Sequence, residues 1–582
     1  MKNYKKVYAA FILAGGLILH GCNGIFDDLA INPNQPSMGA YFTSPSAVND
    51  AVMTMYGYMS TQRCLGASGS KTTIIRSDEA SSNSDYGKPG MFGADLNASY
   101  YTIEQPYTLM YTTASQASYI IETAPSVDFS GNEELRNAYM GEAYFWRAFA
   151  HYYLLINFRN ISPIRQMPRN GDDYVRPLEK PAAVWNFIQE DLAHAKELLP
   201  VKGYWDSKNA GRVTKASAAA LLGKAYLYRS GIEQYYGEDK TTFYSEAAKE
   251  FGDVIDGKYG TYDLTKNYAD NFDVAHENNE ESILEFQFLG DVDNAGFNPG
   301  LATSGLAFDS RGLMLPGAGV GYEGVVHNWL YNAFVNSVDK DGYTDIRMFS
   351  TMIFNDLDAS IHLRNDAGGN PVRLKGPGGY KWEELYPAKN GKEGFATVSN
   401  PLAHPFKAGI RKGIDCSMPT QTEADGTPKL VGVGAGVKEY VYNQPRAHGV
   451  NWRYIRYADV LMMYAEAVVS GGTQASDMTP LQAVNKVRGR ANMSELPSVT
   501  MADIQNERIL EFALEGHRFY DLLRWGKLAS RFTELQESDP NFKKFISADD
   551  FKGFVTNKHE WLPIPINEVN SNPYITENNP GY

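Results

Sequence analysis

Apolar residues recur at helical spacing through most of the first 260 residues. In the segment 45–62, which follows the capping residue Ser44, the side chains of Val48, Val52 and Met55 fall on one face of a helix. A stripe of this kind predicts an amphipathic helix that packs its apolar face on a core. The same spacing predicts further helices over 106–124, 133–158, 182–199, 214–231 and 242–256.

Two of these predicted helices contain the same short motif. It reads 140-MGEAY-144 in one and 222-LGKAY-226 in the other, with glycine after a large apolar residue and tyrosine three positions later. This spacing is typical of the first helix of a tetratricopeptide hairpin, and Ala247 and Phe251 fit the second helix. The glycine lets a neighbouring helix approach closely, and the tyrosine fills the groove beside it. Because the motifs are irregularly spaced, we expect stacked, degenerate hairpins and not a regular solenoid.

The pattern changes in the middle of the chain. The segment 281–290 reads as a strand, and a short helix is expected at about 325–336. Glycine-rich segments lie at 296–324, 365–380 and 424–438. Helical periodicity returns at 454–472, 479–493 and 500–528. The sequence therefore predicts a mainly α fold with a few short strands, in which 41–260 and 453–582 form a helical scaffold and 261–452 a loop-rich insertion.

The first residues predict export. Three lysines precede the apolar run 7–19, which is too short to span a bilayer as a stable helix. The run ends in 19-LHGC-22, which resembles the lipobox read by lipoprotein signal peptidase. We expect a signal peptide over 1–21, a lipidated Cys22 whose acyl chains hold the protein at a membrane surface, and a tether over 22–40. An ordinary signal peptide followed by a chance cysteine is the alternative.

Composition and charge exclude some classes of partner. The 582 residues carry a formal charge of −14, with no run of lysine and arginine after residue 6, whereas nucleic-acid binding requires a clustered basic surface. The 38 tyrosines and 53 glycines favour ordered binding loops that present flat amphipathic side chains. Cys64 and Cys416 are too few and too distant for a structural zinc site, and the sequence leaves open whether they pair.

Motifs that would indicate an enzyme fail on spacing or context. The stretch 66-GASGSKTT-73 nearly matches a phosphate-binding loop, but Ser70 separates the glycine from the lysine. The stretch 319-GVGYEG-324 matches a dinucleotide fingerprint, yet proline and glycine precede it where a buried strand should end. The ten histidines do not cluster as metal ligands, and no nucleophile elbow occurs. We therefore predict no catalytic residues, no metal and no cofactor. A glycosidase is the alternative, because it needs only two carboxylates placed by the fold, and the chain has 68 acidic residues.

One C-terminal segment has the composition of an active site. The stretch 511-EFALEGHRFYDLLRWG-526 contains six acidic, basic or imidazole side chains, those of Glu511, Glu515, His517, Arg518, Asp521 and Arg524. With Glu507, two of these glutamates fall at i, i+4 and i+8 on one side of a predicted helix, interleaved with arginines. This spacing favours an ion-pair network that pins helices together, and His517 reads as a packing histidine more than as a general base.

Several blocks in order along the chain resemble the SusD/RagB family of outer-membrane nutrient-binding lipoproteins. The C-terminal blocks are 456-RYADVLMMYAEA-467, 483-AVNKVRGRA-491, 506-NERILEFALEGHRFYDLLRWG-526, 562-LPIPINEV-569 and 578-NNPGY-582. In the N-terminal half, 141-GEAYFWRAFAHYYLLINF-158 and 212-RVTKASAAALLGKAYLY-228 resemble that family's core helix pairs. With the lipobox, the resemblance runs over nearly the whole chain.

The resemblance implies both a fold and a partner. It implies four tetratricopeptide-like units with an irregular second part, anchored by lipid in the outer membrane and facing the cell exterior. It also implies that the protein is not an enzyme, and that it binds oligosaccharide and passes it to a SusC-like TonB-dependent transporter. Peptide is the cargo in some branches. A surface-anchored glycoside hydrolase, or a helical scaffold with protein partners alone, are the alternatives from other classes.

The loop 76–101 is the first place to look for a ligand site. The family's starch-binding member uses an arc of tryptophans and tyrosine, but this loop contains no tryptophan, so starch is not supported. A sugar site needs a flat apolar face and short polar groups at its edge. The candidates are Asp78, Asn83, Tyr86, Phe92 and Asn97 on this loop, with Tyr322 and Trp382 from the insertion. For each, the alternative is a side chain that packs its own loop, and Trp329 is expected to pack inside its helix.

Overall fold

The structure is a computed structural model. It describes residues 42–61, 63–81, 92, 96–288, 308–309, 325–375, 381, 407–412, 424, 430–432, 438–440, 447–448, 450–539 and 553–582. In these ranges helices predominate and the strands are short, so the predicted fold class, mainly α with a loop-rich part, is confirmed. None of the described helices combines the length and the apolar character that crossing a membrane requires.

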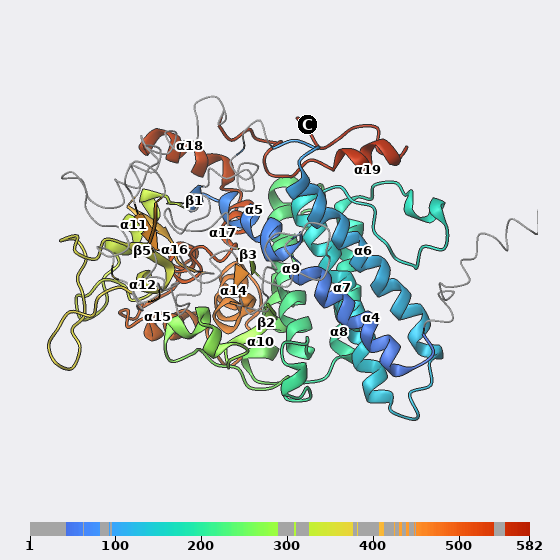
Figure 1. The fold of residues 1–582 in the computed structure, drawn as a ribbon, viewed down its shortest axis with the longest axis horizontal. Helices are drawn as coiled ribbons and strands as arrows, with labels where there is room; N and C mark the ends of the chain where they lie inside the picture. Colours follow the sequence, from blue (N-terminus) through green and yellow to red (C-terminus); the bar gives the residue numbers. More distant parts are fainter. Residues whose placement is uncertain are drawn as a thin grey trace, which may run out of the picture.

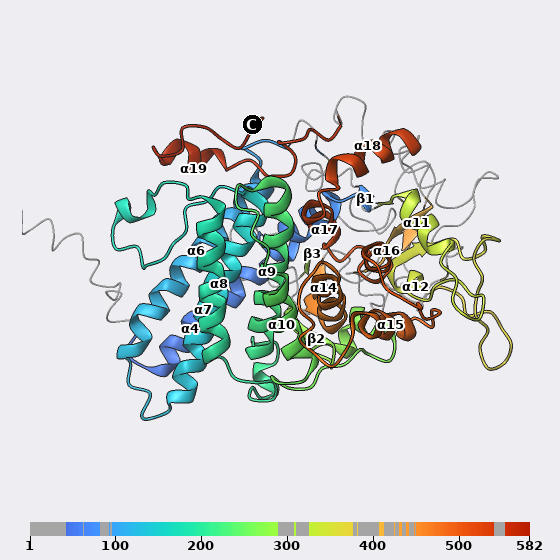
Figure 2. The same cartoon turned by 180° about the vertical axis from the view of Figure 1, so that it is seen from behind.

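Six helices of the N-terminal half pack against one another in chain order. Figure 1 shows them on one side of the molecule, and Figure 2 shows the same arrangement from behind. They are α4 (Pro45–Ser60), α6 (Tyr101–Thr123), α7 (Glu133–Phe158), α8 (Pro181–Leu198), α9 (Lys215–Tyr236) and α10 (Tyr244–Ile255). Every one was predicted, and the bounds of α7 agree with the sequence to the residue. In this part of the chain local periodicity is enough to define the helices.

The glycine motifs mark close helix contacts, as their spacing predicts. A Cβ atom at Gly223 on α9 would lie 2.7 Å from the ring of Phe251 on α10. At Gly141 on α7 it would lie 2.9 Å from Leu199, directly after α8. Both distances are shorter than real Cβ contacts, so any larger residue would force the helices apart. The hairpins depend on glycine at these two positions.

Two helix bounds differ from the sequence prediction. Helix α6 begins at Tyr101, five residues before the predicted start, and contains Pro106 near its beginning. Helix α9 continues to Tyr236, past the predicted end at Gly231. Gly231 does not end the helix. It allows a close contact with another segment, because a Cβ atom on it would lie 2.5 Å from the carbonyl oxygen of Arg524. Such a contact between distant segments has no local signal.

The two ends of the predicted insertion meet in one strand pair. Strand β2 (Ser282–Phe286) pairs antiparallel with β10 (Trp452–Arg456). The first was predicted as a strand, but the second falls at the start of a predicted helix, which begins instead at Tyr457 as α14 (Tyr457–Val469). Because the two strands are paired, the chain leaves the helical part and returns to it at neighbouring points.

A second, four-stranded sheet joins the insertion to the N-terminal half. Its antiparallel order is β1 (Ala80–Ser81), β4 (Val325–Val326), β6 (Ala408–Ile410) and β5 (Met352–Phe354). Helices α11 (Asn328–Val335) and α12 (Met348–Thr351) accompany this sheet. The sheet and both helices lie on the side opposite the N-terminal helices (Figure 1). Two further strand pairs join β3 (Phe308–Asp309) to β9 (Ala447–His448) and β7 (Leu430–Gly432) to β8 (Lys438–Tyr440).

The long C-terminal helix predicted over 500–528 is wrong. The chain forms α16 (Met501–Glu511), a turn over 512–517 and α17 (Arg518–Arg524). Leu514 and Gly516 in the turn have φ of +62° and +85°, left-handed values that no helix continues through. The remaining described α-helices are α5 (Ser70–Ile75), α15 (Pro480–Arg490), α18 (Leu528–Ser538) and α19 (Ile566–Ser571).

Candidate functional site

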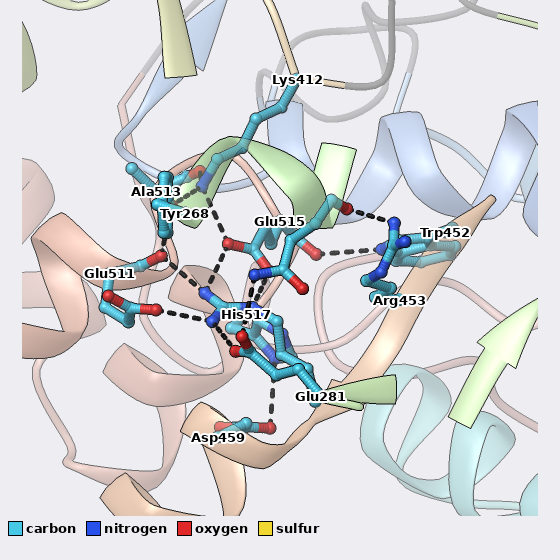
Figure 3. A network of polar contacts seen from close by, with 12 residues as sticks. Tyr268, Glu281, Lys412, Trp452, Arg453, Asp459, Glu511, Ala513, Glu515 and His517 are labelled. Carbon is cyan, nitrogen blue, oxygen red and sulfur yellow. Dashed lines mark hydrogen bonds and ion pairs between the residues drawn. The ribbon is translucent and has the colours of Figure 1, made fainter. Parts of the chain in front are cut away.

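A buried ion-pair network occupies the C-terminal segment that resembles an active site. Arg456, with none of its surface exposed, lies at its centre. Its guanidinium contacts Glu281 at 2.7 Å, Glu511 at 2.6 Å and Glu515 at 2.9 Å. Figure 3 shows Glu281 reaching this point from a segment far away in sequence, and Glu511 and Glu515 reaching it from the C-terminal block. Each carboxylate is paired, so none has the freedom that a general acid or base requires.

Residues of the insertion complete this network. Arg347 contacts Glu507 at 2.5 Å and Glu511 at 3.0 Å. Lys412 reaches Glu515 at 2.8 Å and the carbonyl oxygen of Ala513 at 2.9 Å (Figure 3). Burial lowers the pKa of Lys412 to about 8. The network therefore pins the insertion onto the C-terminal helices.

The pKa of Glu281 shows which influence prevails here. Burial by itself would raise this pKa, but the guanidinium groups of Arg490 and Arg456 outweigh it and hold the pKa at about 2. The carboxylates are charged at neutral pH because they are paired, as a structural network requires. The prediction of an ion-pair network is confirmed.

The predicted placement of Glu507, Glu511 and Glu515 on one side of a single helix is wrong. Glu515 lies in the turn after α16, so the three glutamates do not share one helical face. The interleaved arginines bind other partners, because Arg508 contacts Asp459 and Asp521 at 2.8 Å each, and Arg524 contacts Asp521 at 2.9 Å. The spacing of charges correctly indicated ion pairs but could not identify the partners.

Asp78, predicted to contact sugar hydroxyls, is instead a buried anchor. Its carboxylate accepts hydrogen bonds from Arg518 Nε at 2.9 Å and from Arg531 Nε at 2.7 Å, and its exposed fraction is 0%. Its carbonyl oxygen accepts from the indole N–H of Trp329 at 2.5 Å. The half-buried Trp329 ring packs beneath the Arg531 guanidinium at 4.2 Å. Asp78 is therefore unavailable to a ligand and fixes the start of the loop instead.

Glu79 ties the same point to the C-terminal turn. Its carboxyl accepts the backbone N–H of Leu514 at 3.0 Å and lies 3.2 Å from the Ser77 hydroxyl. The left-handed conformation of Leu514 thus occurs where its N–H meets a group far away in sequence. Burial, reinforced by the neighbouring Asp78 carboxylate, raises the pKa of Glu79 to about 8. The carboxyl is protonated at neutral pH.

Replacing Glu79 by glutamine is expected to flatten the pH dependence of stability. The folded-state pKa of about 8 exceeds the unfolded value of about 4.3, so the folded state keeps a proton that the unfolded chain releases. Stability is then fully present below about pH 4.3 and falls as the pH rises towards 8. We expect Glu79→Gln to remove about 1–3 kcal/mol of this decline, because its amide makes the same hydrogen bonds without ionising.

Urea unfolding of both proteins at pH 5 and pH 8 measures this effect. Glu534→Gln is the control, because the Glu534 side chain is 62% exposed and solvent screens its contact with Arg531. Parallel stability curves for Glu79→Gln and the wild type would contradict a buried, protonated Glu79.

Phe92 and Asn97, the other described candidates of the loop, lie in different environments. Phe92 is 4% exposed, and its ring packs against Phe532 at 5.0 Å and Phe554 at 5.3 Å between centroids. It is therefore closed to a ligand. Asn97 is exposed, and its side-chain oxygen accepts the N–H of Ser99 at 2.9 Å just before α6.

The other predicted residues, Asn83, Tyr86, Tyr322, Trp382 and the lipidation residue Cys22, lie outside the described residues. The strands next to two of them are described. Strand β1 ends at Ser81, five positions before Tyr86, and β4 begins at Val325, three positions after Tyr322. Ser81 and Val325 are direct partners in the sheet. Tyr86 and Tyr322 are therefore both close in sequence to the same pair of neighbouring residues.

Metal and cysteine chemistry find no support in the described part of the chain. No group of three or more His, Cys, Asp or Glu side chains there is arranged to hold a metal ion. Cys64 is a buried thiol whose pKa burial raises, and Cys416 lies outside the described residues.

Segments in both halves of the chain match known protein families. Residues 428–582 match the family model described as SusD family, and residues 31–227 match the model described as starch-binding associating with outer membrane. The chain belongs to the SusD/RagB family. A SusD-like protein of Bacteroides ovatus is 25% identical over 533 residues, covering 90% of this chain and 83% of its own.

Solved structures of SusD-like proteins share the fold. A SusD superfamily protein from Bacteroides vulgatus has a TM-score of 0.67 at 22% identity, covering 93% of this chain and 100% of its own. Surface glycan-binding protein A from Bacteroides thetaiotaomicron, in complex with laminarihexaose, has a TM-score of 0.63 at 18% identity, covering 92% and 100%. The predicted SusD/RagB membership is confirmed.

Sequence reasoning missed several residues that organise this SusD/RagB chain. Glu281, Arg347 and Lys412 enter the network from segments far from the C-terminal block, and Arg531 anchors the loop from α18. None of them belongs to a motif. A lone charged residue within an apolar strand, such as Glu285 or Arg453, was the available signal that buried ion pairs exist here.

Proposed function

We propose that the protein is a cell-surface lipoprotein that binds a glycan and delivers it to a SusC-like TonB-dependent transporter. Family membership and the lipobox ending at Cys22 support an outer-membrane anchor facing the exterior. Among structural relatives, one is described as a laminarin binding SusD-like protein and another was solved with laminarihexaose. A β-glucan or related oligosaccharide is therefore the first ligand class to test.

The observation that carries the proposal is the anchoring of the candidate loop at both ends. Before the segment 82–91, Asp78 binds Arg531 of α18; after it, the ring of Phe92 packs on Phe532 of the same helix. Fixing both ends of a loop lowers the conformational cost of ordering it around a ligand, which favours binding. The buried anchors supply the frame, and the residues between them supply the contacts.

The proposed contacts are Asn83, Tyr86, Asn97, Tyr322 and Trp382. The pairing of Ser81 with Val325 supports a shared site for Tyr86 and Tyr322, because both lie within five residues of that pair. Strand β6, paired with β4, follows the segment that contains Trp382. Aromatic faces stack on the C–H side of a sugar ring while amide groups bond the hydroxyls.

A panel of purified glycans tests the proposal. In affinity electrophoresis of the full-length lipoprotein in detergent, retardation by at least one polysaccharide is expected, laminarin first. Absence of retardation on every glycan, with binding of a peptide pool, would favour the peptide-binding alternative. Release of reducing ends during incubation would instead identify a glycoside hydrolase. Delivery is tested separately by co-purification with the transporter barrel.

Single aromatic substitutions should weaken but not abolish glycan binding. Tyr86→Ala and Trp382→Ala each remove one stacking face, worth about 0.5–1.5 kcal/mol beyond area burial, so a loss of about three- to tenfold in affinity is expected for each. Tyr574→Ala is the matched control, because Tyr574 is 59% exposed and lies beyond α19, in none of the candidate segments. Isothermal titration calorimetry measures the difference, and equal affinities for all four proteins would remove both residues from the site.

A further inference from the structure

A small internal cavity lies where α7 and α9 meet the C-terminal turn. Its volume is about 10 Å³, and its lining includes Tyr152, Lys224, Tyr454, Glu515 and His517. About 10–15 Å³ is the space that the centre of one water molecule needs. The cavity is therefore large enough for a single small occupant.

Three polar atoms of this lining have no hydrogen-bond partner among the described residues. They are Nε2 of His517 and the hydroxyls of Tyr152 and Tyr228. The residues are 4%, 0% and 1% exposed. An unsatisfied buried polar group costs about 1–3 kcal/mol, so native proteins rarely leave several beside one cavity.

The neighbours of His517 define what its free nitrogen offers. The ammonium of Lys224 lies 3.2 Å from Asp459 Oδ2 and 3.4 Å from His517 Nδ1. Because an ammonium can donate but not accept, Nδ1 accepts and the ring proton sits on Nε2. Burial, with the adjacent Lys224 charge, lowers the pKa of His517 to about 3, so the ring is neutral. Nε2 is thus an unused donor, and the Tyr152 hydroxyl can donate or accept.

We infer that this cavity holds one ordered water molecule, which accepts a hydrogen bond from His517 Nε2–H and bonds to the hydroxyl of Tyr152. A water molecule has the size of the space and satisfies a donor and a hydroxyl together. An anion fits poorly, because the carboxylate of Glu515 and several aromatic rings also line the cavity. The water joins α7 to the residue that precedes α17, beside the network in Figure 3.

A crystal structure at high resolution tests this inference directly. We expect one solvent peak within about 2.7–3.2 Å of both His517 Nε2 and the Tyr152 hydroxyl oxygen. A crystal soaked in sodium bromide should show no anomalous signal there. An empty cavity, or a bromide peak in it, would each overturn the inference.

Removing one partner gives a second test. In Tyr152→Phe the water keeps His517 and loses the hydroxyl, so the peak should weaken or vanish. Tyr144→Phe is the control on the same helix, because the Tyr144 ring packs on His194 away from the cavity. The solvent peak in this variant should match that of the wild type. An undiminished peak in Tyr152→Phe would contradict the assigned contacts.

Discussion

Arg456→Met is expected to lower the free energy of unfolding by about 3–5 kcal/mol, the range for breaking a buried ion pair from one side. Methionine has nearly the length of the arginine stem but leaves Glu281, Glu511 and Glu515 without their shared cation. Arg490 and Lys412 would still neutralise part of this charge, so the fold should survive in weakened form. Urea unfolding followed by circular dichroism measures the loss.

Arg169→Met is the matched control for that experiment. The Arg169 side chain is 74% exposed and pairs with Glu122 at 3.0 Å, a contact that solvent screens to about 0–1 kcal/mol. If Arg456→Met lost no more stability than Arg169→Met, the network would not be what holds the insertion on the helices. If the free energy of unfolding of Arg456→Met instead depended less steeply on urea concentration, the insertion would be detaching separately from the rest of the fold.

The helical half of the fold follows from local signals, and the C-terminal turn does not. Helix α7 could be predicted from periodicity, because apolar residues recur at helical spacing for about seven turns. Two glutamates in its first turn, where negative charge is favourable, also mark its start. The break at 512–517 has no comparable signal, since Leu514 takes a left-handed conformation only where Glu79 accepts its N–H. A long-range contact overrides helix propensity there.

The candidate site shows the same division. Residue types in the loop 76–101 suggested a polar edge and an aromatic face, but burial decided the roles of Asp78 and Phe92. The partners that bury them, Arg518, Arg531 and Phe532, lie more than 400 positions away, and no spacing rule connects them. At the base of the loop 76–101, Asp78 pairs with Arg518 of the C-terminal block, so this block holds the start of the loop in place.

If the proposed glycan site is correct, Arg531→Met should weaken glycan binding at least tenfold, which corresponds to about 1.4 kcal/mol. Arg531 does not need to touch the ligand for this to happen. Its guanidinium holds the Asp78 carboxylate from one side and covers the Trp329 ring, so its loss frees the start of the segment that carries Tyr86. Ordering that segment would then oppose binding. The effect should exceed that of removing any single aromatic ring.

For Arg531→Met we expect a loss of glycan affinity without a comparable loss of stability. Arg518 still neutralises Asp78, and the Arg531 side chain is 16% exposed, so the fold should tolerate the change with a small shift in Tm. Arg531→Lys keeps a charge near Asp78 and should restore part of the affinity. Glu534→Ala removes the outer partner of Arg531 and should change neither quantity. Wild-type affinity in Arg531→Met would show that the loop holds its shape without this anchor. Equal losses in the methionine and lysine variants would show that the planar guanidinium is required, because an ammonium cannot both donate to Asp78 as Nε does and cover the Trp329 ring.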